Sequence, residues 1–327
     1  MADSRSDAVE VPHESLGCRK AGSGEPYFPG NQLTWLMRLL FIWITTSSVG
    51  LALASVPDTH AAASLHAKYA SLGERLHHNQ FQRALYLDSS ESSNDLNGSI
   101  YAVVDYPFST VRAALDDPGE WCEVLILHTN TKYCHATTEP SNTVLTVSIG
   151  KKTVQALEDA YPIDFSYRVT AATPQFLEIR LNAAEGPLTT SNYRIHLQAV
   201  PIENGRTFLH LTYSYAYGFI GRVAMETYLA TLGRNKVGFT VTGMRSNGQP
   251  EYIGGMRGVA ERNTMRYYLA IDAYLGAFDK PPDLRLQERL QSWFTATEQY
   301  QRQLHELGRA DYMAMKQMEY LRQQTAR

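Results

Sequence analysis

Residues 256–278 read MRGVAERNTMRYYLAIDAYLGAF, and they follow a long run of strand-like sequence. Apolar side chains recur along this stretch at helical spacing, which predicts one long helix that Pro281 and Pro282 bring to an end. The residues that share one broad face of this helix are Met256, Val259, Ala260, Asn263, Thr264, Tyr267, Ile271, Tyr274 and Phe278. Asn263 and Thr264 interrupt an otherwise apolar face, so this helix is the first place to look for a polar site.

The chain before this helix alternates apolar and polar residues in several successive stretches. They cover residues 143–149, 165–171, 177–182, 193–199 and 209–217. Turn-forming residues separate them, for example Glu185-Gly186-Pro187. This pattern is typical of an antiparallel meander with one buried face. The last stretch places Tyr213, Tyr215 and Tyr217 on one side.

A strand and two short helices are expected before the meander. Residues 99–108 are rich in β-formers, and residues 110–118 and 121–127 have helical character. The polar run at 88–98 predicts a loop, and residues 64–87 show helical spacing. The sequence thus predicts an α+β domain whose final long helix crosses the sheet.

Two pieces of the chain resemble a known superfamily. They are GSIYAVVDYPFSTVRAALDDPGEWCEVLILHTNTKYC at 98–134 and GGMRGVAERNTMRYYLAIDAYL at 254–275. They are similar to START-like (SRPBCC) proteins, which include lipid-transfer and polyketide-cyclase-related domains, and within them to a group of bacterial exported proteins. The resemblance implies the helix-grip fold: a curved antiparallel sheet wrapped on a long C-terminal helix around an internal cavity. Extra N- and C-terminal helices depart from the minimal fold.

The N-terminal part of the chain contains a segment with the layout of a secretory signal. Residues 33–54 read LTWLMRLLFIWITTSSVGLALA, and small residues follow. Met37 is the expected translation start, with Arg38 as the positive end of the signal. Cleavage is expected after Ala54 or after Ala63. The alternative is an uncleaved segment that anchors the protein in a membrane, although the apolar stretch is short and contains several hydroxyl residues.

These features divide the chain into five parts. Residues 1–36 are a disordered leader or a misassigned start, and 37–63 are the signal peptide. Residues 64–97 form an N-terminal helix and linker, 98–280 the START-like ligand-binding domain, and 281–327 a helical tail. We therefore expect a periplasmic or secreted protein.

The cysteines fit an oxidising compartment. Cys18 lies in the expected leader, which leaves Cys122 and Cys134 as an even pair in an exported chain. A disulfide between them is the expected interpretation. The alternative is a metal site that also uses His128 and His135, but the spacing is unlike that of common zinc modules.

Charge and motifs exclude several function classes. The net charge of −3 offers no basic field for nucleic acid. The sequence lacks G-x-S-x-G, H-E-x-x-H, P-loop and G-x-G-x-x-G motifs, and no cofactor or metal is expected. Binding is therefore favoured over catalysis. The alternative is an enzyme whose site is assembled from residues far apart in the sequence.

The expected ligand-binding residues lie on the long helix and on the last strand. They are Tyr213, Tyr215, Tyr217, Arg257, Asn263, Tyr267 and Tyr274. The tyrosines would form an amphipathic wall, and Asn263 would meet a polar head group. Either Arg257 or Arg266 would hold an anionic head group.

Each of these residues also has a purely structural interpretation. The tyrosines would belong to a packed core, and Asn263 would bond to the sheet or to a bound water. Arg257 and Glu261 would form a solvated salt bridge of little energetic weight. His196 and His210, on neighbouring strands, are exposed surface residues or a base or metal pair.

The sequence thus predicts an exported protein that binds or carries an apolar, lipid-like ligand in its cavity. A cyclase- or hydrolase-type enzyme would instead use Asn263, Tyr267 or His210 to polarise a carbonyl. A third alternative is a protein that docks a partner through its tail at 283–324. We expect the protein to bind a lipid or another apolar small molecule. We also expect a transient contact with a membrane and a protein partner for the tail.

Overall fold

The computed structural model describes residues 56–140, 142–230 and 235–325. The described residues all lie in one compact unit, Ala52–Arg327. These described residues do not include the expected leader, the Met37 start or the cleavage site after Ala54. No helix in these described ranges is both long enough and apolar enough to cross a membrane.

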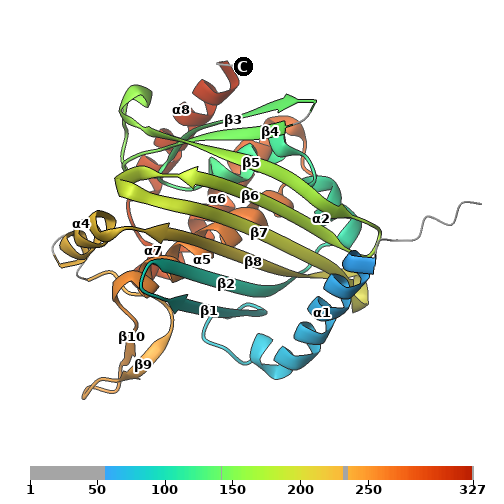
Figure 1. The fold of residues 1–327 in the computed structure, drawn as a ribbon, viewed down its shortest axis with the longest axis horizontal. Coiled ribbons are helices and arrows are strands. Elements are labelled where there is room, and N and C mark those ends of the chain that lie inside the picture. Colours follow the sequence, from blue (N-terminus) through green and yellow to red (C-terminus); the bar gives the residue numbers. More distant parts are fainter. Residues whose placement is uncertain (1–55, 141, 231–234, 326–327) are drawn as a thin grey trace, which may run out of the picture. The chain divides into compact units, whose positions relative to one another are not determined.

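Eight strands within the described residues form one antiparallel sheet in the order β1-β2-β8-β7-β6-β5-β4-β3 (Figure 1). Their bounds are β1 Leu85–Glu91, β2 Asp95–Val104, β3 Thr131–Glu139, β4 Asn142–Ile149, β5 Tyr161–Ala172, β6 Leu177–Glu185, β7 Thr190–Ile202 and β8 Arg206–Tyr217. Strands β4 to β8 confirm the predicted meander. Because β2 pairs with β8, the N-terminal hairpin of β1 and β2 extends the sheet beyond the last strand of the meander.

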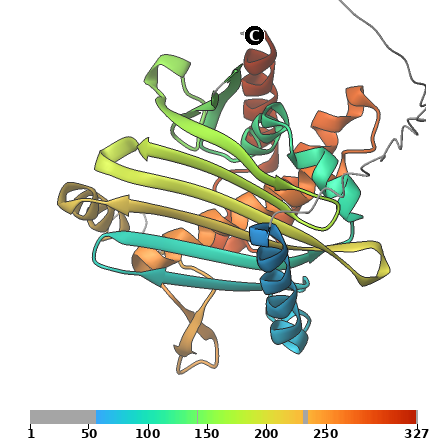
Figure 2. The same cartoon turned by 45° about the vertical axis from the view of Figure 1, so that its right-hand side comes forward.

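The helices lie on the two faces of this sheet. Their bounds are α1 Val56–Leu72, α2 Phe108–Leu115, α3 Pro118–Leu125, α4 Phe219–Ala230, α5 Gly255–Gly276, α6 Pro282–Glu298, α7 Gln301–Leu304 and α8 Arg309–Thr325. A small hairpin of β9 Val241–Met244 and β10 Pro250–Tyr252 precedes α5. Helices α5, α6 and α8 lie on one side of the sheet and α1 on the other (Figures 1 and 2). We call the face that α5 covers the inner face.

This arrangement confirms the predicted helix-grip fold. The sheet is curved and antiparallel, and the long helix α5 packs across its inner face. Residues of α5 share one core cluster with inward-facing residues of most of the strands. A second, smaller cluster lies on the other face, where Leu65 and Leu72 of α1 pack on Val103, Val200 and Phe208.

Both edge strands were missed in the sequence. The helix predicted over 64–87 ends at Leu72 and is followed by a short 3-10 turn, Gly73–Leu76. The loop predicted at 88–98 is wrong, because β1 and β2 pair there as a hairpin. Only one face of an edge strand is buried and one of its sides is unpaired, so polar residues such as Asp88 are tolerated in it. The other edge strand, β3, is polar for the same reason.

Helix α5 lies close to β2 at Gly98. A Cβ atom at Gly98 would lie 2.2 Å from the Thr264 hydroxyl oxygen and 3.2 Å from the Ala260 carbonyl oxygen. Thr264 is fully buried and donates to that carbonyl at 2.8 Å. The polar residue predicted on the helix face is therefore part of the helix–sheet contact.

Replacing Gly98 with alanine is expected to force α5 away from β2. Overpacking of this kind typically costs about 1–3 kcal/mol in the free energy of unfolding. Urea unfolding of Gly98→Ala measures the loss, and Gly218→Ala is a control because a Cβ there meets nothing within 4 Å. Adding Thr264→Ala to Gly98→Ala should recover part of the loss. If the losses in free energy of unfolding from the two single changes simply add in the double variant, Gly98 and Thr264 are not in contact.

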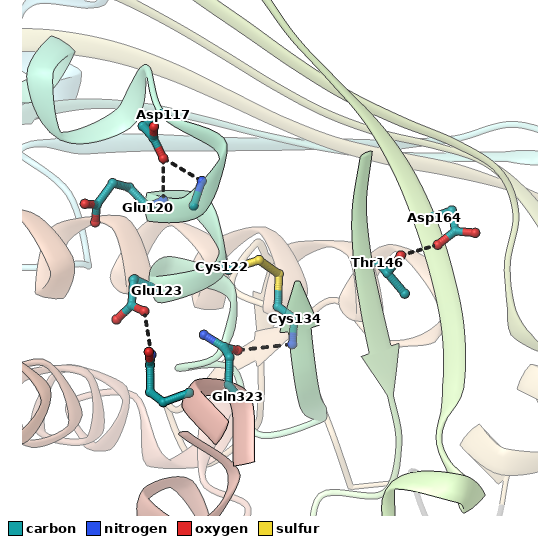
Figure 3. The surroundings of a disulfide bond; sticks show 10 residues. Asp117, Glu120, Cys122, Glu123, Cys134, Thr146, Asp164 and Gln323 are labelled. Carbon is teal, nitrogen blue, oxygen red and sulfur yellow. Dashed lines mark hydrogen bonds between the residues drawn. A yellow bond between two sulfur atoms is a disulfide. The ribbon is translucent and has the colours of Figure 1, made fainter. Parts of the chain in front are cut away.

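The predicted disulfide joins Cys122 of α3 to Cys134 of β3, with the Cα atoms 5.2 Å apart (Figure 3). The alternative metal site is wrong, since both thiols are consumed by this bond. The backbone N–H of Cys134 donates to Gln323 of α8 at 3.1 Å, and Gln324 donates to Glu123 at 3.3 Å. The C-terminal helix thus packs against the cross-linked region.

Two buried lysines and one glutamate fix α8 to the domain. Glu319 accepts from Lys132 at 2.9 Å and from Lys316 at 2.6 Å, and all three side chains are 0–1% exposed. Lys316 also donates to the carbonyl oxygens of His128 and Thr131. The tail that the sequence offered as a partner-docking segment therefore uses these buried groups within its own chain.

The free energy of unfolding is expected to rise with pH between pH 8 and 10. Burial lowers the pKa of Lys316 to about 8, although Glu319 raises it. An unfolded lysine titrates near 10.4, so in this window the unfolded chain binds more protons than the folded chain. The expected gain from this group is about 2 kcal/mol. Urea unfolding at pH 8 and 10 tests it; a stability that falls over this range, or an equal rise in Lys316→Met, would contradict it.

Candidate functional site

A cavity of about 160 Å³ lies between the inner face of the sheet and α5. Its wall is mostly apolar and aromatic. The lining residues are Leu125, Asn130, Val147, Ile149, Ile163, Phe165, Pro187, Leu188, Thr190, Tyr193, Ile195, Tyr213, Tyr215, Gly221, Val259, Asn263 and Tyr267. An apolar wall with a few polar groups is typical of a small-molecule site.

The regular spacing of both elements produces this wall. On α5, Val259, Asn263 and Tyr267 are four residues apart, so they stack along one face of the helix. On the strands every second residue points inward, as for Tyr213 and Tyr215 of β8. These five residues of the cavity wall are therefore ones that the sequence pattern already assigned to the interior.

Aromatic rings form a continuous part of the wall. Tyr193 stacks on Tyr215 with ring centroids 5.1 Å apart, and Tyr213 lies 5.2 Å from Tyr267. Burial raises the pKa of Tyr213 and Tyr267 well above the usual value, with neighbouring tyrosines adding to the shift. These hydroxyl groups are therefore neutral at physiological pH and can donate hydrogen bonds.

Asn263 is the central polar group of the wall. Arg266 donates to the side-chain oxygen of Asn263 at 3.5 Å. This contact turns the oxygen toward Arg266 and leaves the two N–H groups as donors. Asn130 adds a second amide, whose side-chain oxygen is buried without a hydrogen-bond partner.

Behind Asn263, three cations converge on Glu306. It accepts from Lys152 at 2.5 Å, Lys236 at 3.2 Å and Arg266 at 2.5 Å. Burial opposes ionisation of Glu306, but Arg266 and the lysines outweigh it and lower its pKa to about 2. Burial, together with Arg266, lowers the pKa of Lys152 to about 8. Within the described part of the chain this cluster carries more positive than negative charge.

His128 connects this cluster to the cavity wall. It is buried, and its ring lies 5.2 Å from that of Tyr267. Burial, followed by the charges of Arg266, Lys152 and Lys316, holds the pKa of His128 well below its usual value. A neutral imidazole is the form that tolerates this positive surrounding.

Four of the seven predicted ligand-binding residues line the cavity: Tyr213, Tyr215, Asn263 and Tyr267. The other three are not among its lining residues. Tyr217 donates to Glu91, Arg257 donates to Ser89 at 3.2 Å, and Tyr274 donates to Glu120.

The expected solvated salt bridge between Arg257 and Glu261 is wrong. Glu261 is fully buried and accepts from the Ser89 hydroxyl at 2.7 Å and from the backbone N–H of Thr240 at 2.9 Å. Arg266, the other arginine expected to hold an anionic head group, is also buried. The periodic pattern could not distinguish these positions because α5 is covered on several sides, by the sheet, α3 and α6.

The two histidines of neighbouring strands do not form a pair. His196 contacts Glu178 at 2.7 Å, whereas His210 stacks on Tyr101 with ring centroids 4.0 Å apart. Burial lowers the pKa of His210 to about 4. Both side chains are half-buried, so the expectation that they are exposed surface residues is wrong as well.

Several functional positions were not found in the sequence. Asn130 and Thr190 line the cavity from the ends of strands, where no periodic pattern marks the inward side. The cluster around Glu306 joins this residue to partners 40 to 154 positions away, so no local spacing indicates it.

The cavity opens beside exposed apolar residues. Leu188, which lines it, is 66% exposed, and Gly221 lines it from the first turn of α4. Phe219 of α4 is 80% exposed, and Val223 of the same helix is also exposed. These side chains place apolar surface at this end of the cavity.

Comparison with known proteins gives similarity of fold only. No family model matches the chain, and no match is found among curated proteins. Among solved structures, human StAR-related lipid transfer protein 5 is 9% identical, with a TM-score of 0.30 over 53% of this chain and 89% of that one. A norcoclaurine synthase from Thalictrum flavum is 11% identical, with a TM-score of 0.32 over 44% of this chain and 91% of that one.

The Zhui aromatase/cyclase from Streptomyces sp. R1128 is similar as well, at 10% identity and a TM-score of 0.27, covering 67% of this chain and 95% of that one. Scores this low carry no argument about ligand or chemistry. The strand order and the helix across the inner face define the helix-grip fold, which is the fold expected of START-like (SRPBCC) proteins.

Proposed function

We propose that this protein binds a small apolar molecule in the cavity between the sheet and α5. The observation that carries the proposal is the cavity itself, with its aliphatic and tyrosine wall and few polar groups. Moving one CH₂ group from water into such a site gains about 0.8 kcal/mol. Burial of an apolar ligand that fits the cavity is therefore sufficient to drive binding.

The size of the cavity restricts the ligand. Drug-sized ligands occupy pockets of about 300–1,000 Å³, and an apolar cavity of about 150 Å³ in another protein accepts benzene. At about 160 Å³ the cavity holds a small ring or a short chain, not a phospholipid or a sterol. A longer acyl chain would extend through the opening beside Leu188.

The lining residues favour binding over catalysis. Among the described residues that line the cavity, none is a carboxylate, histidine, lysine, arginine or cysteine. A cyclase or hydrolase needs a positioned acid or base within hydrogen-bond reach of its substrate. Asn263 and Tyr267 can hold a polar group, but neither is a base at neutral pH.

Calorimetric titration with 1-hexanol tests the proposal. Burial of its six carbons at about 0.8 kcal/mol each predicts a Kd of about 0.1–1 mM. One site per chain, with heat that saturates, is the expected result. No saturable binding of hexanol, hexanoate or a fluorescent fatty acid would contradict the proposal.

We further propose that the protein is exported, and that the signal is removed after Ala54. Cleavage there leaves α1 complete. Cleavage after Ala63 would remove the first eight residues of α1, including Ala61 and Ala62, which pack on the smaller core cluster beneath α1. N-terminal sequencing of the mature chain tests this. A chain that begins near Ala2 would refute it.

A further inference from the structure

The polar part of the cavity wall lies against the cation-rich cluster around Glu306. Asn263 belongs to both, since it lines the cavity and accepts from Arg266, which is itself bonded to Glu306. A buried hydrogen-bonded path thus runs from the charged cluster to the cavity surface. The same corner of the cavity holds the hydroxyl-bearing rings of Tyr213 and Tyr267.

All of these groups favour negative charge in the ligand. Asn263 presents amide N–H donors, and the two tyrosines remain protonated because burial raises their pKa values. Behind them, Arg266, Lys152 and Lys236 share one carboxylate. Arg266 is buried and the two lysines are partly exposed, and a surplus of positive charge in such a site stabilises an anion more strongly than the same charges do in water.

The pKa values of the neighbouring ionisable groups are consistent with this surplus of positive charge. Lys152 has a lowered pKa and His128 a strongly lowered one, and in both cases Arg266 is the leading electrostatic cause after burial. A second cation-rich group, Lys132 and Lys316 with Glu319, also contacts His128, because Lys316 donates to the His128 carbonyl oxygen.

We infer that the ligand is a small carboxylic acid with an apolar body, whose carboxylate contacts Asn263, Tyr213 and Tyr267. This inference rests on the proposed function and specifies its ligand class. The apolar body lies along Val147, Ile163 and Ile195 toward the opening at Leu188. The carboxylate accepts hydrogen bonds from neutral donors and is stabilised by the cations behind them.

Three ligands of equal chain length test this charge preference: hexanoate, 1-hexanol and hexylamine, titrated at pH 7. Hexanoate is expected to bind about tenfold more tightly than hexanol, and hexylamine at least tenfold more weakly. If hexanol binds as tightly as hexanoate, or hexylamine binds best, the inference is overturned while the proposed function stands. If none of the three binds, the proposed function itself fails.

Asn263→Asp places a negative charge at the proposed carboxylate site. The change is nearly isosteric, and Arg266 is positioned to pair with the new carboxylate, so the fold should persist. Hexanoate affinity is expected to fall more than tenfold, whereas hexanol affinity should stay within about threefold. Equal losses for both ligands would overturn the inference.

Lys236→Gln provides a milder test, because this side chain is partly exposed and its loss leaves Arg266 and Lys152 on Glu306. We expect hexanoate to weaken about threefold and hexanol to be unaffected. Lys280→Gln is the matched control at an exposed lysine beyond the end of α5, and it should change neither affinity. If the two variants behave alike toward hexanoate, the cations around Glu306 do not stabilise the carboxylate, and the inference is overturned.

Discussion

Glu319→Ala is expected to lower the free energy of unfolding by about 3–5 kcal/mol. The change leaves the ammonium groups of Lys132 and Lys316 buried without their shared carboxylate. Removing one member of a buried ion pair typically costs this much, because the remaining charge is desolvated and uncompensated. Urea unfolding followed by circular dichroism measures the loss.

Two controls separate this effect from a general loss of side chain. Glu74→Ala removes a carboxylate from the exposed pair with His78 and should cost under about 1 kcal/mol. The triple variant Lys132→Met, Lys316→Met and Glu319→Leu should recover most of the stability, since an apolar set can replace a buried ion cluster. A Glu319→Ala protein within 1 kcal/mol of the wild type would refute the account of how α8 is held.

Val259→Phe is expected to abolish binding of hexanol and hexanoate, with at least a tenfold loss in affinity. Val259 lines the cavity from α5, and a phenyl group there would occupy the space that the ligand needs. The cost in stability should be small, because the new ring enters an existing cavity rather than a filled core.

Val241→Phe is the matched control for this variant. Val241 lies in β9, is exposed and is not among the cavity-lining residues. The same chemical change there should leave both affinities unchanged. If Val259→Phe binds hexanol as well as the control does, and remains folded, the ligand does not occupy the cavity.

Much of the fold could be predicted from residue periodicity. Alternation located β4 to β8, and helical spacing located α5 within two residues at either end. These elements have one consistently buried side, so the spacing of their apolar residues indicates directly which side packs on the core. Strands β1 and β3 could not be found this way, because an edge strand has fewer neighbours to specify its residues.

The site was only partly accessible from the sequence. Tyr213, Tyr215, Asn263 and Tyr267 follow from the inward face of β8 and the polar interruption of α5. The burial of Glu261 and Arg266 does not follow, because their partners come from distant segments. Charged residues on a helix are usually exposed, and only the tertiary structure shows when they are paired inside.

Methyl NMR spectra of the protein during titration with 1-hexanol show where in the fold the ligand binds. If the ligand enters the space between the sheet and α5, chemical shifts should change at the methyl groups of Val147, Ile149, Ile163, Ile195 and Val259. The methyl groups of Val103 and Val200, on the opposite face of the sheet, should be unaffected. Shifts spread equally over both faces, or confined to surface residues, would contradict an internal binding site.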